Sequence, residues 1–134
     1  MPYPISDLEK FAPGVTALKS VGIRTTKGLI EAAKNPKGRK MLSAKTGLEE
    51  RRILRWANMA DRMRIKGVGE DYAHLLEVAG VNTVKELRYR SPAKLAKAMA
   101  EINIKRKLVL LLPSEGTVLR WIEHAKKLPL KISY

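Results

Sequence analysis

Apolar side chains recur along this chain at intervals of three and four residues, the spacing that places them on one face of an α-helix. In the longest such stretch, from Glu49 to Met63, the apolar positions are Ile53, Leu54, Trp56, Ala57, Ala60 and Met63. The other positions carry mainly charged residues: Arg51, Arg52, Arg55, Asp61 and Arg62. Shorter periodic stretches cover residues 15–21, 27–33, 37–45, 84–89 and 93–101, and another follows Ser114. The pattern predicts an all-α fold with Trp56 and Trp121 in its core.

Residues that start and stop helices stand between these stretches. Gly22, Gly47 and Gly80 each follow a predicted helix, where a residue free to take φ > 0 is favoured, and Asn103 can do the same after Glu101. Ser6 is expected to cap a short first helix that carries Leu8 and Phe11. Pro129 is expected to end the last helix, so that residues 129–134 trail off as a tail.

One turn has the composition of an anion-binding site. Gly67 and Gly69 bracket Val68 directly before a predicted helix whose apolar face holds Tyr72, Leu75, Leu76 and Ala79. Glycine allows strained backbone angles and lets another molecule approach the main chain closely. The free backbone N–H groups at the start of the second helix would then point at an anion. Glu70 and Asp71 in the first turn favour the helix but repel a phosphate group.

The two halves of the chain match each other. Leu8–Pro13 aligns with Ile65–Glu70 at an offset of 57 residues, and Val21–Thr25 aligns with Ala79–Thr83 at an offset of 58. We therefore expect a single domain over residues 1–134, made of repeat 1 (5–62), repeat 2 (63–128) and a tail (129–134). The hairpin of repeat 1, at residues 10–14, is expected to be degenerate because Lys10 and Ala12 replace the two glycines.

The charge of the chain points to a polyanionic partner. Lysine and arginine number 27 against 13 acidic residues, which gives a formal net charge of +14. Such an excess is usually matched by nucleic acid, and an anionic membrane surface is the second candidate. The absence of cysteine excludes disulfides and thiolate metal sites and fits a cytoplasmic location. The apolar run from Val109 to Leu112 is too short to span a bilayer.

The hairpin sequence resembles the helix-hairpin-helix motif of DNA-binding proteins that do not read sequence. With both halves placed, nearly the whole chain resembles the bacterial family catalogued as domain of unknown function 4332. The stretches that carry this resemblance are residues 55–69, 76–87, 112–114 and 121–129. The resemblance implies tandem helix-hairpin-helix repeats packed as a SAM-like helical bundle, and it implies no settled activity.

These observations favour a non-enzymatic protein that binds nucleic acid, with DNA as the first candidate, independently of sequence. The amides of Val68 and of Gly69 to Asp71 would hold one phosphate, with Arg64 and Lys66 at its sides, and other cations would add diffuse attraction. The candidate nucleic-acid-binding residues are Arg51, Arg52, Arg55, Arg64, Lys66, Gly67, Val68, Gly69, Lys105, Arg106 and Lys107.

Two alternatives remain open at this point. The chain could be a protein-interaction or assembly module that uses its basic face or an exposed apolar patch at Leu108–Leu112. It could also be a lysine-dependent lyase, although no lysine is singled out by its surroundings. We expect no catalytic residue, metal or cofactor, because His74 and His124 are the only histidines and neither belongs to a metal-ligand motif.

Overall fold

The structure is a computed structural model that describes residues 3–10 and 14–134, and in these residues the chain is helical without β-strands. A short 3-10 helix, η1 (Ile5–Leu8), comes first. The α-helices of the first half are α1 (Val15–Ser20), α2 (Thr26–Ala33), α3 (Pro36–Thr46) and α4 (Glu50–Arg62). Those of the second half are α5 (Glu70–Val78), α6 (Val84–Leu87), α7 (Pro92–Arg106) and α8 (Glu115–Lys127). The predicted all-α fold is confirmed.

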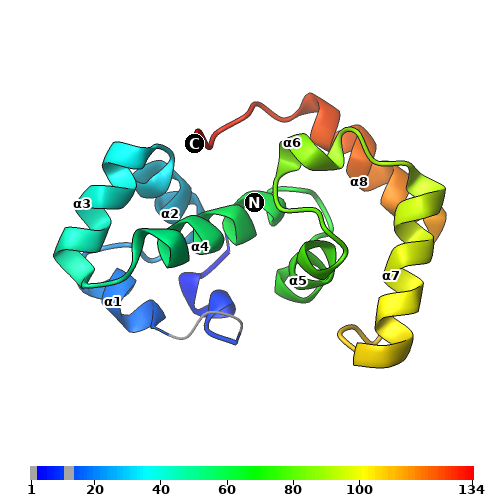
Figure 1. Cartoon of the computed structure of the whole chain (residues 1–134), viewed down its shortest axis with the longest axis horizontal. Helices are drawn as coiled ribbons and strands as arrows, with labels where there is room; N and C mark the ends of the chain where they lie inside the picture. The colour runs from blue at the N-terminus through cyan, green and yellow to red at the C-terminus, as the bar shows by residue number, and fades with distance from the viewer. Residues whose placement is uncertain (1–2, 11–13) are drawn as a thin grey trace.

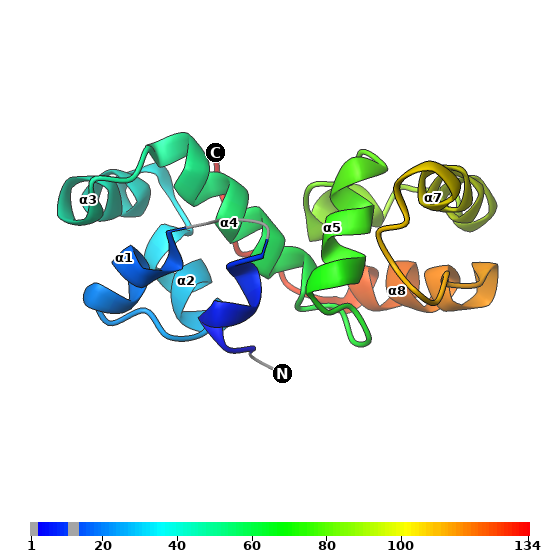
Figure 2. The same ribbon diagram turned by 90° about the horizontal axis from the view of Figure 1, so that it is seen from below.

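The helices form two groups that share one core. Figure 1 shows α1–α4 on one side and α5–α8 on the other, with α4 running from the first group towards the second. Within the groups, α2 packs along α4 and α7 packs along α8, as the view from below also shows (Figure 2). A single hydrophobic cluster joins Trp56 of α4, Leu76 of α5 and Trp121 of α8. Both tryptophans are buried, so their predicted place in the core is confirmed.

Local sequence sets most helix boundaries. The side chains of Thr25, Asn35, Thr83, Ser91 and Ser114 each accept a hydrogen bond from a backbone amide in the first turn of the helix that follows. Glycines with positive φ follow α1, α3 and α5 (Gly22, Gly47 and Gly80). The order of helix, glycine turn and capped helix thus occurs in both halves. The degenerate hairpin predicted at 10–14 includes residues 11–13, which lie outside the described residues.

The C-terminal end of α7 differs from the prediction. The helix continues past Asn103 to Arg106, and Lys107 rather than Asn103 takes the left-handed conformation, with φ of 49°. The Asn103 side chain instead binds Val109 through both of its polar atoms: Nδ2 donates to the Val109 carbonyl (3.1 Å) and Oδ1 accepts from the Val109 amide (3.0 Å). Asparagine is therefore used here as a clamp on the following loop.

Both ends of the chain also correct the prediction. The N-terminal element is a four-residue 3-10 helix that follows Pro4, without a side-chain cap from Ser6, and Phe11 lies outside the described residues. The last residues return to the first half of the molecule instead of trailing off. The Ser133 amide donates to the Lys34 carbonyl (2.8 Å), and the Tyr134 hydroxyl donates to Asn58 Oδ1 (2.8 Å).

The sequence pattern of α4 predicts that its charged side chains are exposed, but two of them are buried. Arg62 is 1% exposed, and its guanidinium donates to the carbonyls of Ala73 (2.9 Å) and Asn82 (2.7 Å). Burial lowers the pKa of Arg62 to about 10. Asp61 is also buried, and its carboxylate accepts a hydrogen bond from the Val84 amide at the start of α6 (2.9 Å). These two side chains fasten α4 to the second half.

In the described residues, no helix has the length and apolar character needed to cross a membrane.

Candidate nucleic-acid interface

The turn between α4 and α5 is anchored from inside and open on its outer side. Ile65 and Val68 are buried, whereas Lys66 and Gly67 are exposed. Gly67 has φ of 91°, a left-handed conformation that L side chains rarely adopt, and a Cβ atom there would lie 3.4 Å from Trp121 Nε1. The backbone conformation of the turn therefore requires glycine at position 67, whether or not a ligand binds.

The turn offers fewer free amides than the sequence predicts. The Val68 amide donates to the Ile65 carbonyl (3.0 Å), so the prediction that it contacts a phosphate is wrong for this conformation. The Lys66 amide donates to Nδ1 of His124 on α8 (2.9 Å). By contrast, the amides of Gly69, Glu70 and Asp71 have no acceptor among the described residues. The amides of Gly67 and Tyr72 also have no acceptor there, and among these free groups the sequence predicts those of Gly69, Glu70 and Asp71 as phosphate donors.

Neither the backbone conformation nor the packing requires glycine at position 69. Its φ of −91° and ψ of −166° describe extended backbone that other residues adopt, and it precedes α5 without capping the helix through a side chain. A Cβ atom built on Gly69 meets nothing within 4 Å. The space above its main chain is therefore open to an incoming group.

The charges at the turn are mixed. Lys66 is exposed, as predicted for a residue beside a phosphate. Arg64, which is predicted to lie on the other side, is engaged elsewhere: its guanidinium donates to Asp61 Oδ1 (2.7 Å) and to the Pro129 carbonyl (2.5 Å). Asp71 forms an ion pair with Lys10 (3.1 Å), so part of the negative charge in the first turn of α5 is compensated.

A hollow of about 350 Å³ lies beside the turn. It is lined by Gly67, Gly69, Glu70, Asp71, Tyr72, Val109, Leu110 and Leu111. The Tyr72 hydroxyl donates to the Leu111 carbonyl (2.6 Å), which holds the loop after α7 against the start of α5. The turn and this loop therefore form one continuous surface, although they are about 40 residues apart in sequence (111 − 72 = 39).

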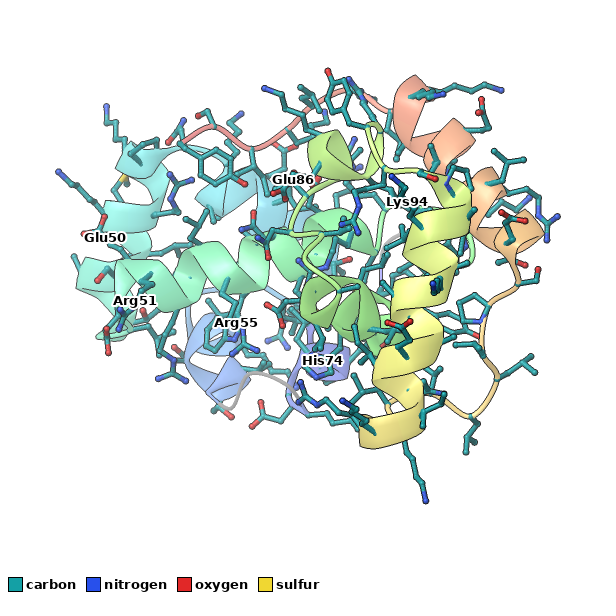
Figure 3. The ribbon with its side chains drawn as sticks, turned by 45° about the vertical axis from the view of Figure 1, so that its right-hand side comes forward. Glu50, Arg51, Arg55, His74, Glu86 and Lys94 are labelled. Carbon is teal, nitrogen blue, oxygen red and sulfur yellow. The ribbon has the colours of Figure 1, made fainter. Side chains whose placement is uncertain are left out.

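The three predicted arginines of α4, Arg51, Arg52 and Arg55, lie on its first half, away from the turn. Figure 3 shows Arg51 and Arg55 on the side of α4 that also faces His74 of α5. Arg51 is 88% exposed, with one long contact to Glu49 (3.5 Å), and the Arg52 guanidinium lies over the Trp56 ring (5.4 Å). From Arg51 to the end of α4 the helix rises by roughly 16 Å. The structure therefore does not bring these arginines into the turn, and a long ligand would be needed to contact both.

Arg55 also holds the two halves of the protein together. It binds the Glu77 carboxylate of α5 through two atoms, at 3.0 Å and 3.1 Å. Burial alone would raise the pKa of Glu77, but the hydrogen bond from Arg55 and the nearby charge of Arg62 outweigh burial and lower that pKa. Arg55 is thus only partly available to an external phosphate.

The last predicted group, Lys105, Arg106 and Lys107, is exposed at the end of α7. None of the three has an ion pair with an acid in the part of the chain that the structure describes. Burial lowers the pKa of His74 on α5, and the charge of Arg106 lowers it further. The helix that carries them, α7, contacts α5, and the loop that follows them borders the glycine turn.

A comparison with protein families identifies the family of this chain. The model of the family described as "Domain of unknown function (DUF4332)" matches residues 11–128. The chain belongs to the DUF4332 family. No solved structure matches it.

The polar chemistry of this DUF4332 protein does not assemble a metal site in its described residues, where no three histidine, aspartate or glutamate side chains come together. Both histidines have structural contacts. His124 accepts the Lys66 amide, and His74 lies 3.4 Å from the Glu77 carboxylate. The contact of His124 with the turn was not predicted from the sequence, since the two residues are 58 positions apart.

Proposed function

We propose that this protein binds nucleic acid, DNA in the first place, without reading its sequence, and that the turn between α4 and α5 holds a backbone phosphate in the manner of a helix-hairpin-helix motif. The observation that supports this most is Gly69. Its backbone angles and surroundings leave no need for glycine inside the molecule, while its own amide and those of Glu70 and Asp71 have no acceptor among the described residues. A glycine at this position is explained if an external group approaches the main chain closely, because a side chain would block that approach.

The phosphate would be held mainly by the main chain. The amides of Gly69, Glu70 and Asp71 would donate to its oxygens, and the positive end of the α5 dipole would add to the attraction. Lys66 would approach from the exposed side. The pairing of Asp71 with Lys10 reduces the repulsion that an anion would meet here. The contribution of Val68 to this arrangement is its buried side chain, which fixes the turn.

The wider basic surface would attract the rest of the polymer. Lys105, Arg106 and Lys107 are the strongest candidates because they are exposed, lie next to one another and have no acidic partner among the described residues. Arg51 on α4 is also exposed and has only a long contact with Glu49 (3.5 Å), whereas Arg55 is bound by Glu77. Contacts of this kind are made to phosphates and carry no base information, so binding should be independent of sequence and sensitive to salt.

The replacement Gly69→Ala tests the phosphate site. The new methyl group would enter open space, so the free energy of unfolding should change by less than about 0.5 kcal/mol. Affinity for a 20-base-pair duplex, measured by fluorescence anisotropy, should fall by roughly tenfold or more, because the methyl group displaces a charge-assisted hydrogen bond worth about 1.5–3 kcal/mol.

Gly116→Ala is the matched control. Gly116 lies in the first turn of another helix, α8, and a Cβ atom there would be 3.8 Å or more from its neighbours. This variant should bind the duplex as well as the unmodified protein does. Equal affinity of Gly69→Ala and Gly116→Ala would show that the turn between α4 and α5 does not contact the phosphate backbone.

A further inference from the structure

The loop after α7 presents large apolar side chains to solvent. Leu110 is fully exposed (107%), Leu111 is 76% exposed and Leu112 is 41% exposed, and Ile104 in the last turn of α7 is 76% exposed. We call these four residues the aliphatic tip. Figure 2 shows the loop beside α5, leading from the end of α7 to the start of α8. We propose that the aliphatic tip inserts into the interface of an anionic lipid bilayer.

The tip is held in its exposed position by specific contacts. Val109, between the cations and the leucines, points inward and is buried. The Asn103 side chain fixes both polar atoms of the Val109 backbone, and the Tyr72 hydroxyl fixes the Leu111 carbonyl. A free loop of this composition would fold its leucines onto the protein to remove them from water. Here the clamps keep the leucines outside, which indicates that another apolar phase covers them.

The same clamps satisfy three backbone groups at the base of the loop. Backbone N–H and C=O groups that enter hydrocarbon must keep their hydrogen bonds, because an unsatisfied group costs several kcal/mol. The amide and carbonyl of Val109 and the carbonyl of Leu111 already have partners within the protein. Shallow insertion of the leucines therefore leaves these three backbone groups hydrogen-bonded.

The charges next to the tip identify the kind of surface. Lys105, Arg106 and Lys107 directly precede the loop and are exposed, without an acidic partner in the described residues. Cations at the headgroup level combined with leucines in the acyl boundary are the pattern of proteins that lie on anionic membranes. The carboxylates that line the hollow behind the loop, Glu70 and Asp71, belong to α5, and Asp71 is paired with Lys10.

The residue types at the tip fit lipid better than nucleic acid. Leucine and isoleucine have no aromatic ring to stack on bases and no polar group to hydrogen-bond with base edges. The two proposals share the cations Lys105, Arg106 and Lys107, but the leucine positions form part of no proposed phosphate contact, so variants at Leu110 and Leu111 separate this inference from the proposed DNA binding.

Vesicle flotation tests the inference. The protein should float with vesicles of 70% phosphatidylcholine and 30% phosphatidylglycerol and remain unbound with pure phosphatidylcholine. The double variant Leu110→Ser/Leu111→Ser should reduce the partition coefficient by about tenfold or more for each leucine, given the cost of exposing a buried leucine. Met41→Ser is the control, since Met41 is 52% exposed but lies on α3. Equal partitioning of the double variant and the unmodified protein would overturn the inference.

A second measurement reports on insertion itself. The chain contains no cysteine, so Leu110→Cys provides a unique site for an environment-sensitive fluorophore. Its emission should shift to the blue with the anionic vesicles, and the same label at Met41→Cys should not shift. No shift at position 110 would overturn the inference. A loss of duplex affinity in Leu110→Ser/Leu111→Ser, with vesicle binding intact, would also overturn it and assign the tip to nucleic acid.

Discussion

Replacing Lys105, Arg106 and Lys107 together by glutamine is expected to weaken binding to duplex DNA by roughly 10²–10³-fold at about 0.1 M salt. Each phosphate that a cation neutralises contributes about 0.9 to the slope of log K against log salt, because condensed counterions are released. Three lost contacts should lower the magnitude of that slope by about 2.7. A salt titration of duplex binding by fluorescence anisotropy measures both quantities.

The control removes the same charge from another part of the molecule. Lys37, Lys40 and Lys45 are exposed on α3, in the other helix group. Their joint replacement by glutamine should change the affinity and the slope much less. If both triple variants lose the same affinity, binding depends on net charge spread over the whole surface, and the assignment of Lys105, Arg106 and Lys107 to a defined interface is wrong.

Arg62→Ala is expected to lower the free energy of unfolding by about 3–5 kcal/mol, the range for breaking a buried charged network. The guanidinium is the partner of the Ala73 and Asn82 carbonyls, and it lies 3.9 Å from Glu77. Its removal leaves buried acceptors without donors and opens a cavity between α4 and α5. Urea denaturation followed by circular dichroism measures the change.

Arg51→Ala is the comparison for this experiment, since it removes the same side chain from an exposed position on the same helix. It should change the free energy of unfolding by less than about 0.5 kcal/mol. A loss below about 1 kcal/mol for Arg62→Ala would mean that the two halves do not depend on this arginine for their attachment.

Much of the fold could be predicted from local sequence signals, whereas the burial of Arg62 could not. The capping residues Thr83 and Ser114 and the positive-φ glycines Gly22 and Gly80 act within a few residues, so the sequence places them correctly. Arg62 belongs to the polar face of α4 by periodicity. It is buried because the second half of the chain packs on that face. The periodicity of one helix carries no information about which other helices pack against it.

The candidate site could likewise be predicted from the sequence only in its local features. The spacing of Gly67 and Gly69 identifies a tight turn before a helix, and the structure has one there. Which amides stay free depends on distant partners. His124 reaches the Lys66 amide from α8, and the Pro129 carbonyl binds Arg64 from beyond that helix. The sequence predicts that Asn103 ends α7. It does not reveal that the Asn103 side chain forms hydrogen bonds with the backbone of Val109 instead.

The central claim is that the main chain at the start of α5 receives a phosphate, and amide chemical shifts test it most directly. The ¹⁵N-labelled protein would be titrated with a short DNA duplex while its backbone amide signals are followed by NMR. If the phosphate is bound there, the amides of Gly69, Glu70 and Asp71 shift strongly and together with that of Lys66. If these amides stay in place while residues 105–107 respond to the duplex, the turn is not a phosphate site and the claim is contradicted.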